Sequence, residues 1–270
     1  YSVDKLPSIL KKVRNLKIPM VALFPYTPNK KKNKQGSEAL NPNNLICRSL
    51  KLIKSKFPDI GVMCDVALDP YTSHGHDGVL INNEIDNDET IKILIQQAIL
   101  QAKCGCDVIA PSDMMDGRIG LIRKALDKEK FKDVSILSYA VKYASSFYGP
   151  FREAVGSKSK LKKDKKTYQM DYRNSFESFR EVGLDLKEGA DMVMVKPGMI
   201  YLDIISKIKE NFKIPVLAYQ VSGEYSLIKN AIKNKFLSDE ALIESIISFK
   251  RAGACAIVTY FAIDIAKKIN

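Results

Sequence analysis

Short apolar segments alternate along the chain with longer segments in which apolar residues recur every three or four positions. A short continuous apolar run predicts a strand covered on both faces, and the longer spacing predicts a helix. The predicted strands are 18–24, 60–68, 107–111, 134–141, 191–195, 214–221 and 256–261. The predicted helices between them include 44–56, 89–103, 118–126, 176–188, 201–210 and 239–252.

This alternation predicts an α/β fold with a parallel sheet and helices around it. Seven strands are one fewer than the eight of a (β/α)8 TIM barrel, and residues 2–14 show a helical pattern that would follow a strand. We therefore expect a single TIM-barrel catalytic domain over residues 1–270, N-terminally truncated so that it lacks the first strand. An open, doubly wound sheet of seven strands is the alternative.

Composition and charge restrict the classes of protein further. Of the 270 residues 46% are hydrophobic, which is enough for a core and excludes wholesale disorder. No apolar run reaches the roughly 20 residues that cross a bilayer, so we expect no membrane partner. The net charge is +12, but 35 of the 43 basic residues are scattered lysines, whereas nucleic-acid binders typically concentrate arginine on one face. We expect no nucleic-acid partner, and a basic nucleic-acid-binding module is the non-enzyme alternative.

Lysines follow two predicted strands at the end where a TIM barrel builds its active site. Lys142 follows the run 134–141, and Lys196 follows the run 191–195. A lysine at the rim of an apolar strand is partly desolvated, which lowers its pKa and exposes a nucleophilic amine. Two lysines on adjacent strands also disfavour each other's charged form. The pair therefore predicts Schiff-base chemistry on a carbonyl substrate.

The loop after the run 60–68 holds both histidines of the chain, His74 and His76, among Asp65, Asp69 and Asp77. This set is compatible with a metal site, and its carboxylates would favour a hard cation over zinc. A polar loop with structural histidines is the other interpretation. The five cysteines contain no C-x-x-C pair and predict reduced thiols.

Six stretches between about residue 60 and the C-terminus form a pattern with a known counterpart. They are DVALDPYTSHGHDG (65–78), APSDMMDGRIG (110–120), LSYAVKYASSFYGPFREA (137–154), EGADMVMVKPGMIYLDI (188–204), YQVSGEYS (219–226) and FKRAGACAIVTYF (249–261). In this order they resemble the 5-aminolevulinate dehydratase, or porphobilinogen synthase, family. The resemblance implies a (β/α)8 barrel with an N-terminal arm that reaches round a neighbouring subunit. It also implies a homo-oligomer, an octamer where the arm is present.

The resemblance implies that two 5-aminolevulinate molecules join, with loss of two waters, to give porphobilinogen for tetrapyrrole and heme biosynthesis. Lys196 looks like the lysine that forms a Schiff base with the first substrate, and Lys142 like the one that takes the second. The implied carboxylate-binding residues are Arg152, Lys165 and Gln169 for the second substrate, and Ser222 and Tyr260 for the first. Lys165 stands where the family often has arginine, so it keeps the charge and loses the bidentate fork. The lysine-rich segment 156–170 would close over this anionic site.

The sequence departs from the family at the metal. Many members bind a catalytic zinc through three cysteines, whose positions are here Ala67, Asp69 and Asp77. Zinc prefers thiolate or imidazole, so we expect a zinc-independent enzyme with Mg²⁺ or no metal at Asp69 and Asp77. A remote, allosteric Mg²⁺ site of the family matches Glu181, whose own context indicates only an exposed helix glutamate.

A class I Schiff-base aldolase on a TIM barrel is the alternative enzyme, because it also needs a lysine at a strand end. Two such lysines, with Arg152 and Lys165 beside them, indicate instead two carboxylate-bearing substrates. We expect the compartment to be a plastid or the cytoplasm, with any targeting segment before the first residue.

Overall fold

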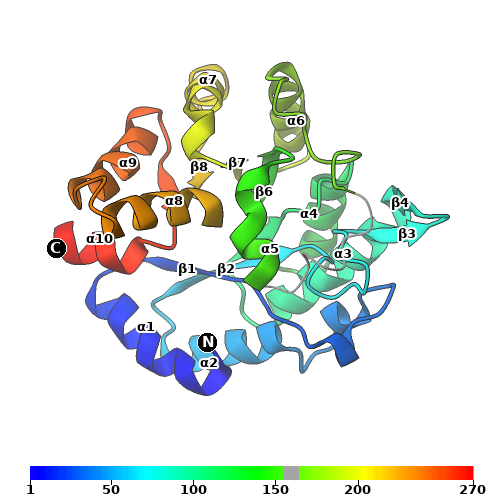
Figure 1. Ribbon diagram of the computed structural model, residues 1–270. Coiled ribbons are helices and arrows are strands. Elements are labelled where there is room, and N and C mark those ends of the chain that lie inside the picture. The colour runs from blue at the N-terminus through cyan, green and yellow to red at the C-terminus, as the bar shows by residue number, and fades with distance from the viewer. Residues whose placement is uncertain (155–163, 270) are drawn as a thin grey trace.

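A computed structural model describes residues 1–154 and 164–269, and the side chains at 152–154 fall outside that description. Within it, seven parallel strands form one sheet in the order β1-β2-β5-β6-β7-β8-β9, with helices ranged around the outside (Figure 1). The strands are β1 (Met20–Leu23), β2 (Gly61–Val66), β5 (Val108–Pro111), β6 (Ser135–Lys142), β7 (Met192–Lys196), β8 (Val216–Tyr219) and β9 (Ala256–Val258).

The helices follow the strands in turn. They are α1 (Leu6–Asn15), α2 (Leu45–Lys56), α3 (Asn87–Lys103), α4 (Arg118–Lys128), α5 (Gly149–Ala154), α6 (Phe176–Lys187), α7 (Leu202–Phe212), α8 (Ser222–Lys233), α9 (Glu240–Arg251) and α10 (Ala262–Ile269). The predicted helices correspond to α1, α2, α3, α4, α6, α7 and α9, whereas α5, α8 and α10 lie outside them. Within the described ranges, no helix combines the length and the apolar character that a bilayer crossing requires.

The strand order decides between the two predicted architectures. A doubly wound sheet reverses its strand order at a switch point, whereas here the strands of the sheet follow one another in sequence order from β1 to β9. The prediction of an α/β fold of the TIM-barrel type is therefore confirmed. A two-stranded antiparallel hairpin, β3 (Val79–Ile81) with β4 (Glu84–Asp86), was not predicted and follows β2 outside the main sheet.

Four predicted strands end earlier than the apolar pattern indicates. The runs 18–24, 60–68, 214–221 and 256–261 end as strands at Leu23, Val66, Tyr219 and Val258. The run 214–221 forms only β8, because α8 begins at Ser222 directly after it. The run 256–261 forms only β9, because the Thr259 hydroxyl accepts the N–H of Phe261 in a turn that leads into α10.

Apolar side chains fill both sides of the sheet. Between the sheet and the helices, β7 contributes Val193 and Val195 to a cluster with residues of α7. On the inner side, Met194 of β7 joins Leu137 and Tyr139 of β6. Each fully buried aliphatic side chain stabilises the fold by about 1.5–3 kcal/mol. The inner cluster closes the barrel below the strand ends, so polar groups at those ends lie above an apolar floor.

Strand β6 carries one more residue than β7 along their paired stretch. Ser138 pairs with Val193 and Val141 with Val195, with a register shift between them. Tyr139 packs on the inner cluster, but Ala140 and Val141 both pack on the outer one. Strict alternation would turn the residue after Val141 outward. The bulge reverses the alternation, so that Lys142 pairs with Lys196 and its side chain enters the barrel mouth.

Candidate active site

The two strand-end lysines lie side by side at the mouth of the barrel. Lys142 ends β6 and Lys196 ends β7, and their backbones are paired across the two strands. Both side chains are buried, with 5% of Lys142 and 8% of Lys196 exposed. They line one small pocket of about 30 Å³, whose other walls are Phe24, Asp65, Asp69, Asp77, Ser112, Tyr148, Phe151, Lys165 and Gln169. The structure thus brings the two candidate lysines into one pocket.

Aromatic rings surround the amine of Lys196. Its Nζ lies 4.5 Å from the ring centre of Tyr219 and 5.1 Å from that of Tyr139, with Tyr148 and Phe151 at 5.6 and 5.7 Å. Within residues 1–154 and 164–269 the amine makes no ion pair. Burial, and after it the positive charge of Lys142, lowers the pKa of Lys196 to about 7. A large fraction of this amine is therefore neutral and nucleophilic near neutral pH.

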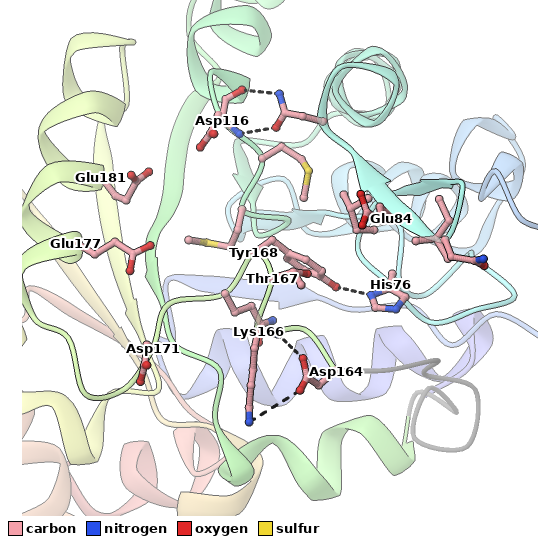
Figure 2. Close-up of a pocket in the computed structure, with 17 residues that line it drawn as sticks. His76, Glu84, Asp116, Asp164, Lys166, Thr167, Tyr168, Asp171, Glu177 and Glu181 are labelled. Carbon is pink, nitrogen blue, oxygen red and sulfur yellow. Dashed lines mark hydrogen bonds and ion pairs between the residues drawn. The ribbon is translucent and has the colours of Figure 1, made fainter.

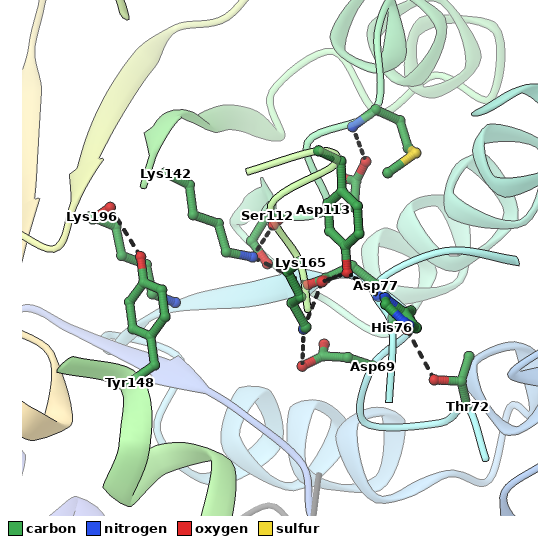
Figure 3. A network of polar contacts seen from close by, with 12 residues as sticks. Asp69, Thr72, His76, Asp77, Ser112, Asp113, Lys142, Tyr148, Lys165 and Lys196 are labelled. Carbon is green, nitrogen blue, oxygen red and sulfur yellow. Dashed lines mark hydrogen bonds and ion pairs between the residues drawn. The ribbon is translucent and has the colours of Figure 1, made fainter. Parts of the chain in front are cut away.

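Lys142 is held in a different way. Its ammonium donates to the backbone carbonyl of Ser112 and forms an ion pair with Asp77 at 3.2 Å (Figure 3). The two lysines are thus neighbours in different surroundings: aromatic rings surround the Lys196 amine, and Lys142 is paired with a carboxylate.

Asp77 is the centre of the polar network in Figure 3. Its Oδ2 lies 2.6 Å from the Lys165 ammonium and accepts the Tyr168 hydroxyl at 2.8 Å. Burial alone would raise the pKa of Asp77, but Lys142 and Lys165 outweigh burial and hold it well below its usual range. Lys165 also lies 3.5 Å from Asp69, so a single ammonium links both aspartates. Asp77 is consequently an anion that orders the cations at the mouth.

The histidines take structural roles in this loop. His74 Nε2 contacts the Lys34 carbonyl at 3.1 Å, and His74 Nδ1 accepts the backbone N–H of His76 at 3.2 Å. His76 Nδ1 contacts the Tyr168 hydroxyl at 3.0 Å. These contacts favour the interpretation of a polar loop with structural histidines over that of metal ligands.

The predicted carboxylate-binding residues divide into two groups. Lys165 and Gln169 line the same space as the two lysines, and the Gln169 Oε1 is buried without a hydrogen-bond partner among the described residues. Ser222 begins α8, where its hydroxyl accepts the N–H of Phe151 at 2.9 Å. Tyr260 lies outside that lining and packs against Tyr225, with 46% of its surface exposed. The side chain of Arg152, on α5, falls outside the described set.

Asp65 is the residue whose place the sequence analysis underrated. It lies near the end of β2 and lines the space of the lysines, and its Oδ1 is buried without a hydrogen-bond partner among the described atoms. Burial, and after it the negative charge of Asp69, raises the pKa of Asp65 to about 6. A carboxyl group with such a pKa exchanges protons near neutral pH. The signal in the sequence was its position at a strand end, shared with Lys142 and Lys196.

The residues at the mouth do not fit a divalent cation in this arrangement. Both oxygens of Asp77 face ammonium groups, and Asp69 faces Lys165, so a metal ion would lie against positive charge. Among the described residues, no group of three or more His, Cys, Asp or Glu side chains is arranged to hold a metal. Ala67 offers no ligand atom.

Glu181 lies apart from the lysines, on α6, in the acidic hollow of Figure 2. This hollow measures about 1050 Å³, and its wall includes Asp116 and Glu177. Glu181 is half-buried, and burial, with Asp185 and Asp116 as further causes, raises its pKa. It is therefore not the freely exposed glutamate that its local sequence indicates. As at the mouth, the described side chains around Glu181 include no group of three or more His, Cys, Asp or Glu residues arranged to hold a metal.

Fold and site together define a class, that of TIM-barrel enzymes whose strand-end lysines are placed to attack a carbonyl group. Residues 1–268 match the profile of the family described as delta-aminolevulinic acid dehydratase. The chain belongs to this family.

Individual relatives agree with this assignment. The delta-aminolevulinic acid dehydratase of Bradyrhizobium diazoefficiens is 55% identical over 270 residues, all of this chain and 76% of that protein. The chloroplastic enzyme of Physcomitrium patens is 51% identical over 258 residues, which are 95% of this chain and 60% of that protein. The crystal structure of the Toxoplasma gondii enzyme, in complex with the reaction product porphobilinogen, superposes with a TM-score of 0.97 at 47% identity. That match covers 99% of this chain and 77% of the Toxoplasma chain.

The environment of Lys196 predicts how imine formation depends on pH. The rate of covalent trapping at Lys196 by 5-aminolevulinate and cyanoborohydride should rise with pH through about 7 and level off above it, because the neutral amine attacks. Lys142→Met removes the neighbouring charge and should move the midpoint to higher pH, whereas the charge-conserving Lys142→Arg should move it less. Peptide mapping by mass spectrometry measures the adduct. An unchanged midpoint in Lys142→Met would contradict this account of the pKa.

Proposed function

We propose that this chain condenses two molecules of 5-aminolevulinate into porphobilinogen, with loss of two waters, through imines at Lys196 and Lys142. The observation that carries the proposal is the pair of buried strand-end lysines in one pocket, within a chain of the delta-aminolevulinic acid dehydratase family. The Toxoplasma relative, whose structure holds porphobilinogen, supports the same product. The family assignment weighs against the aldolase and nucleic-acid alternatives.

Lys196 reacts first in this proposal. Its amine is the one with the lowered pKa, so it attacks the ketone carbon of the first substrate and expels that oxygen as water. Lys142 is engaged by the Asp77 carboxylate and the Ser112 carbonyl, and it must leave these contacts to attack the second substrate. The difference between the two amines supplies the asymmetry that the joining of two identical substrates requires.

Asp65 is the proposed proton carrier at this pocket. A carbinolamine becomes an imine only when its oxygen is protonated and leaves as water, and a nearby acid with a pKa close to neutral supports that step. Asp65 has a pKa raised to about 6 and an Oδ1 that no described group occupies. Its anion also opposes the burial that lowers the pKa of Lys196.

The substrates carry carboxylates, and the proposal assigns them to the groups around the mouth. Lys165 and Gln169 would hold the second substrate, since both line the pocket and Lys165 brings positive charge. Ser222 and Tyr260 would hold the first, beside the ends of β8 and β9. Arg152 keeps its proposed place with Lys165, although its side chain is outside the described set.

The proposed enzyme is of the zinc-independent type. The positions of the family's zinc-binding cysteines are Ala67, Asp69 and Asp77, and the two aspartates already serve Lys165 and Lys142. We derive no step through a metal at the mouth. Mg²⁺ would instead be held near Glu181 and Asp116, largely through water, where it would stabilise α6 and act allosterically.

The remaining partners follow the family resemblance. A homo-oligomer is proposed, an octamer where an N-terminal arm is present, and the exposed Phe176 and Phe236 offer apolar contact surface for it. A plastid or the cytoplasm is the proposed compartment, and the chloroplastic Physcomitrium relative supports the first of these.

Removing each lysine should separate the two imines. Lys196→Ala should reduce porphobilinogen formation below detection, because it takes away the only proposed site for the first imine. Lys142→Ala should also be severe, yet leave adduct formation at Lys196 measurable. Lys128→Ala on the exposed surface of α4 is the matched control and should retain activity. Porphobilinogen and the trapped adduct are quantified by mass spectrometry, and adducts found only at other lysines would refute the assignment.

Metal dependence gives a second test. Activity should survive a zinc-selective chelator, because the mouth offers oxygen and no thiolate. Stimulation by Mg²⁺ should vanish in Glu181→Ala while basal activity persists, and Glu210→Ala, an exposed glutamate on α7, should retain it. Loss of stimulation in Asp69→Ala instead would place the ion at the mouth. Inactivation by zinc removal, reversed by zinc and not by Mg²⁺, would refute the zinc-independent type.

A further inference from the structure

A second buried carboxylate lies just behind the lysine pocket. Glu224 is in the first turn of α8 and has no exposed surface. Its Oε2 accepts the backbone N–H of Val221 at 2.9 Å. This contact is half of a capping box, because Val221 has no side-chain oxygen to complete it. The other oxygen of the carboxylate, Oε1, accepts hydrogen bonds from a different segment.

That other segment follows Lys196. The Glu224 Oε1 accepts the N–H of Met199 at 2.8 Å and that of Ile200 at 3.3 Å, where a short 3-10 helix begins beyond β7. One carboxylate therefore joins two loops, one directly after the imine-forming lysine and the other directly before Ser222. These loops belong to the adjacent strands β7 and β8.

Both loops are packed with little room to move. A Cβ added at Gly198 would meet the Phe249 ring at 2.6 Å and the Tyr219 carbonyl at 3.1 Å. A Cβ added at Gly223 would meet the Phe147 carbonyl at 2.4 Å. Backbones that approach this closely transmit a small displacement instead of absorbing it.

The environment of Glu224 is unusual for a group that only stabilises the fold. Within the described residues it has no basic side chain at ion-pair distance, so backbone N–H groups alone balance its charge. Burial raises the pKa of Glu224 to about 7, and the N–H groups of Val221, Met199, Ile200 and Gly198 oppose that rise. Burying a carboxylate without a cation is costly. A glutamine of the same shape would cost less, but it could not accept from both sides.

We propose that Glu224 is a positioning residue that sets the distance between the Lys196 amine and the Ser222 hydroxyl. The inference rests on the proposed function, in which Lys196 forms the first imine and Ser222 receives the carboxylate of the same substrate. Glu224 touches neither the amine nor the substrate. It acts through the backbone, by holding the two loops that carry those groups in one fixed arrangement.

Glu224→Gln tests this directly. The amide keeps the size of the side chain and one acceptor, but its NH₂ group opposes either the Val221 N–H or the N–H groups of Met199 and Ile200. We expect the 5-aminolevulinate concentration that half-saturates cyanoborohydride trapping at Lys196 to rise about tenfold or more. Trapping at saturating substrate should stay within about threefold of the parent. The assay is run above pH 7, where both the Glu224 carboxylate and the neutral Lys196 amine predominate.

Asp191→Asn is the matched control. Asp191 Oδ2 accepts the N–H of Ile136 at 2.7 Å just before β7, at the far end of the strand that carries Lys196. Like Glu224, Asp191 links segments of neighbouring strands through a carboxylate and a backbone N–H, but it does so at the end of the barrel opposite the site. This variant should lower the melting temperature and leave half-saturation unchanged. If the half-saturating substrate concentration rises equally in both variants, the effect reflects a general loss of stability, and the proposal is overturned.

The outcomes also separate this inference from the proposed function. If the parent chain gives neither adduct nor porphobilinogen, the proposed function fails. If the parent reacts and Glu224→Gln keeps its half-saturation, only the positioning role fails. If Glu224→Gln does not fold, Val221→Pro is the second variant. It removes only the backbone N–H that Val221 donates to Glu224, and the φ of −76° at this position is compatible with proline. Val221→Pro should also raise the 5-aminolevulinate concentration that half-saturates trapping. If that concentration equals the parent's, the proposal is overturned.

Discussion

The site depends on one extra residue in β6. Two strand-end lysines on neighbouring strands meet only if both side chains point into the barrel, and the period of a strand fixes this to every second residue. Because three steps from Ser138 to Val141 match two from Val193 to Val195, Lys142 changes sides and faces inward with Lys196. Without the bulge, Lys142 would face the helices and the pocket would hold a single amine. A local irregularity of pairing thus determines which chemistry this barrel can support.

Bringing two amines together creates an electrostatic problem that the surrounding residues resolve unequally. The Lys196 amine lies among the rings of Tyr139, Tyr148, Phe151 and Tyr219, a setting in which desolvation outweighs the attraction of the ring faces. Lys142 has Asp77 and a carbonyl oxygen instead. Repulsion between the two is relieved because one is neutral for much of the time. In the proposed reaction this inequality gives the order of imine formation.

Much of this could be predicted from the sequence, and the rest could not for identifiable reasons. The parallel sheet and the lysines at its strand ends follow from apolar runs that end in Lys142 and Lys196, because strand ends of a parallel barrel share one face. The inward turn of Lys142 does not follow, because a bulge depends on the partner strand and leaves no mark in the run 134–141. The role of Asp65 was hidden for a related reason, since its burial and its lack of a partner arise only from tertiary packing. Glu181 looked exposed because its own helix does not reveal the hollow that α6 shares with Asp116.

The aspartates at the mouth change what the same loop accomplishes. The family resemblance implies that many members carry zinc-binding thiolates at the corresponding positions. A thiolate site would leave the nearby lysines without anionic partners once the metal is bound. Here Asp77 is shared by Lys142 and Lys165, and Asp69 by Lys165, so the loop neutralises lysines instead of binding a cation. In the proposed reaction the carboxylate of the second substrate competes with Asp77 for Lys165. Its arrival redistributes charge around Lys142 at the stage when that amine has to act. The network can therefore couple binding of the second substrate to the reactivity of the second lysine without a metal ion.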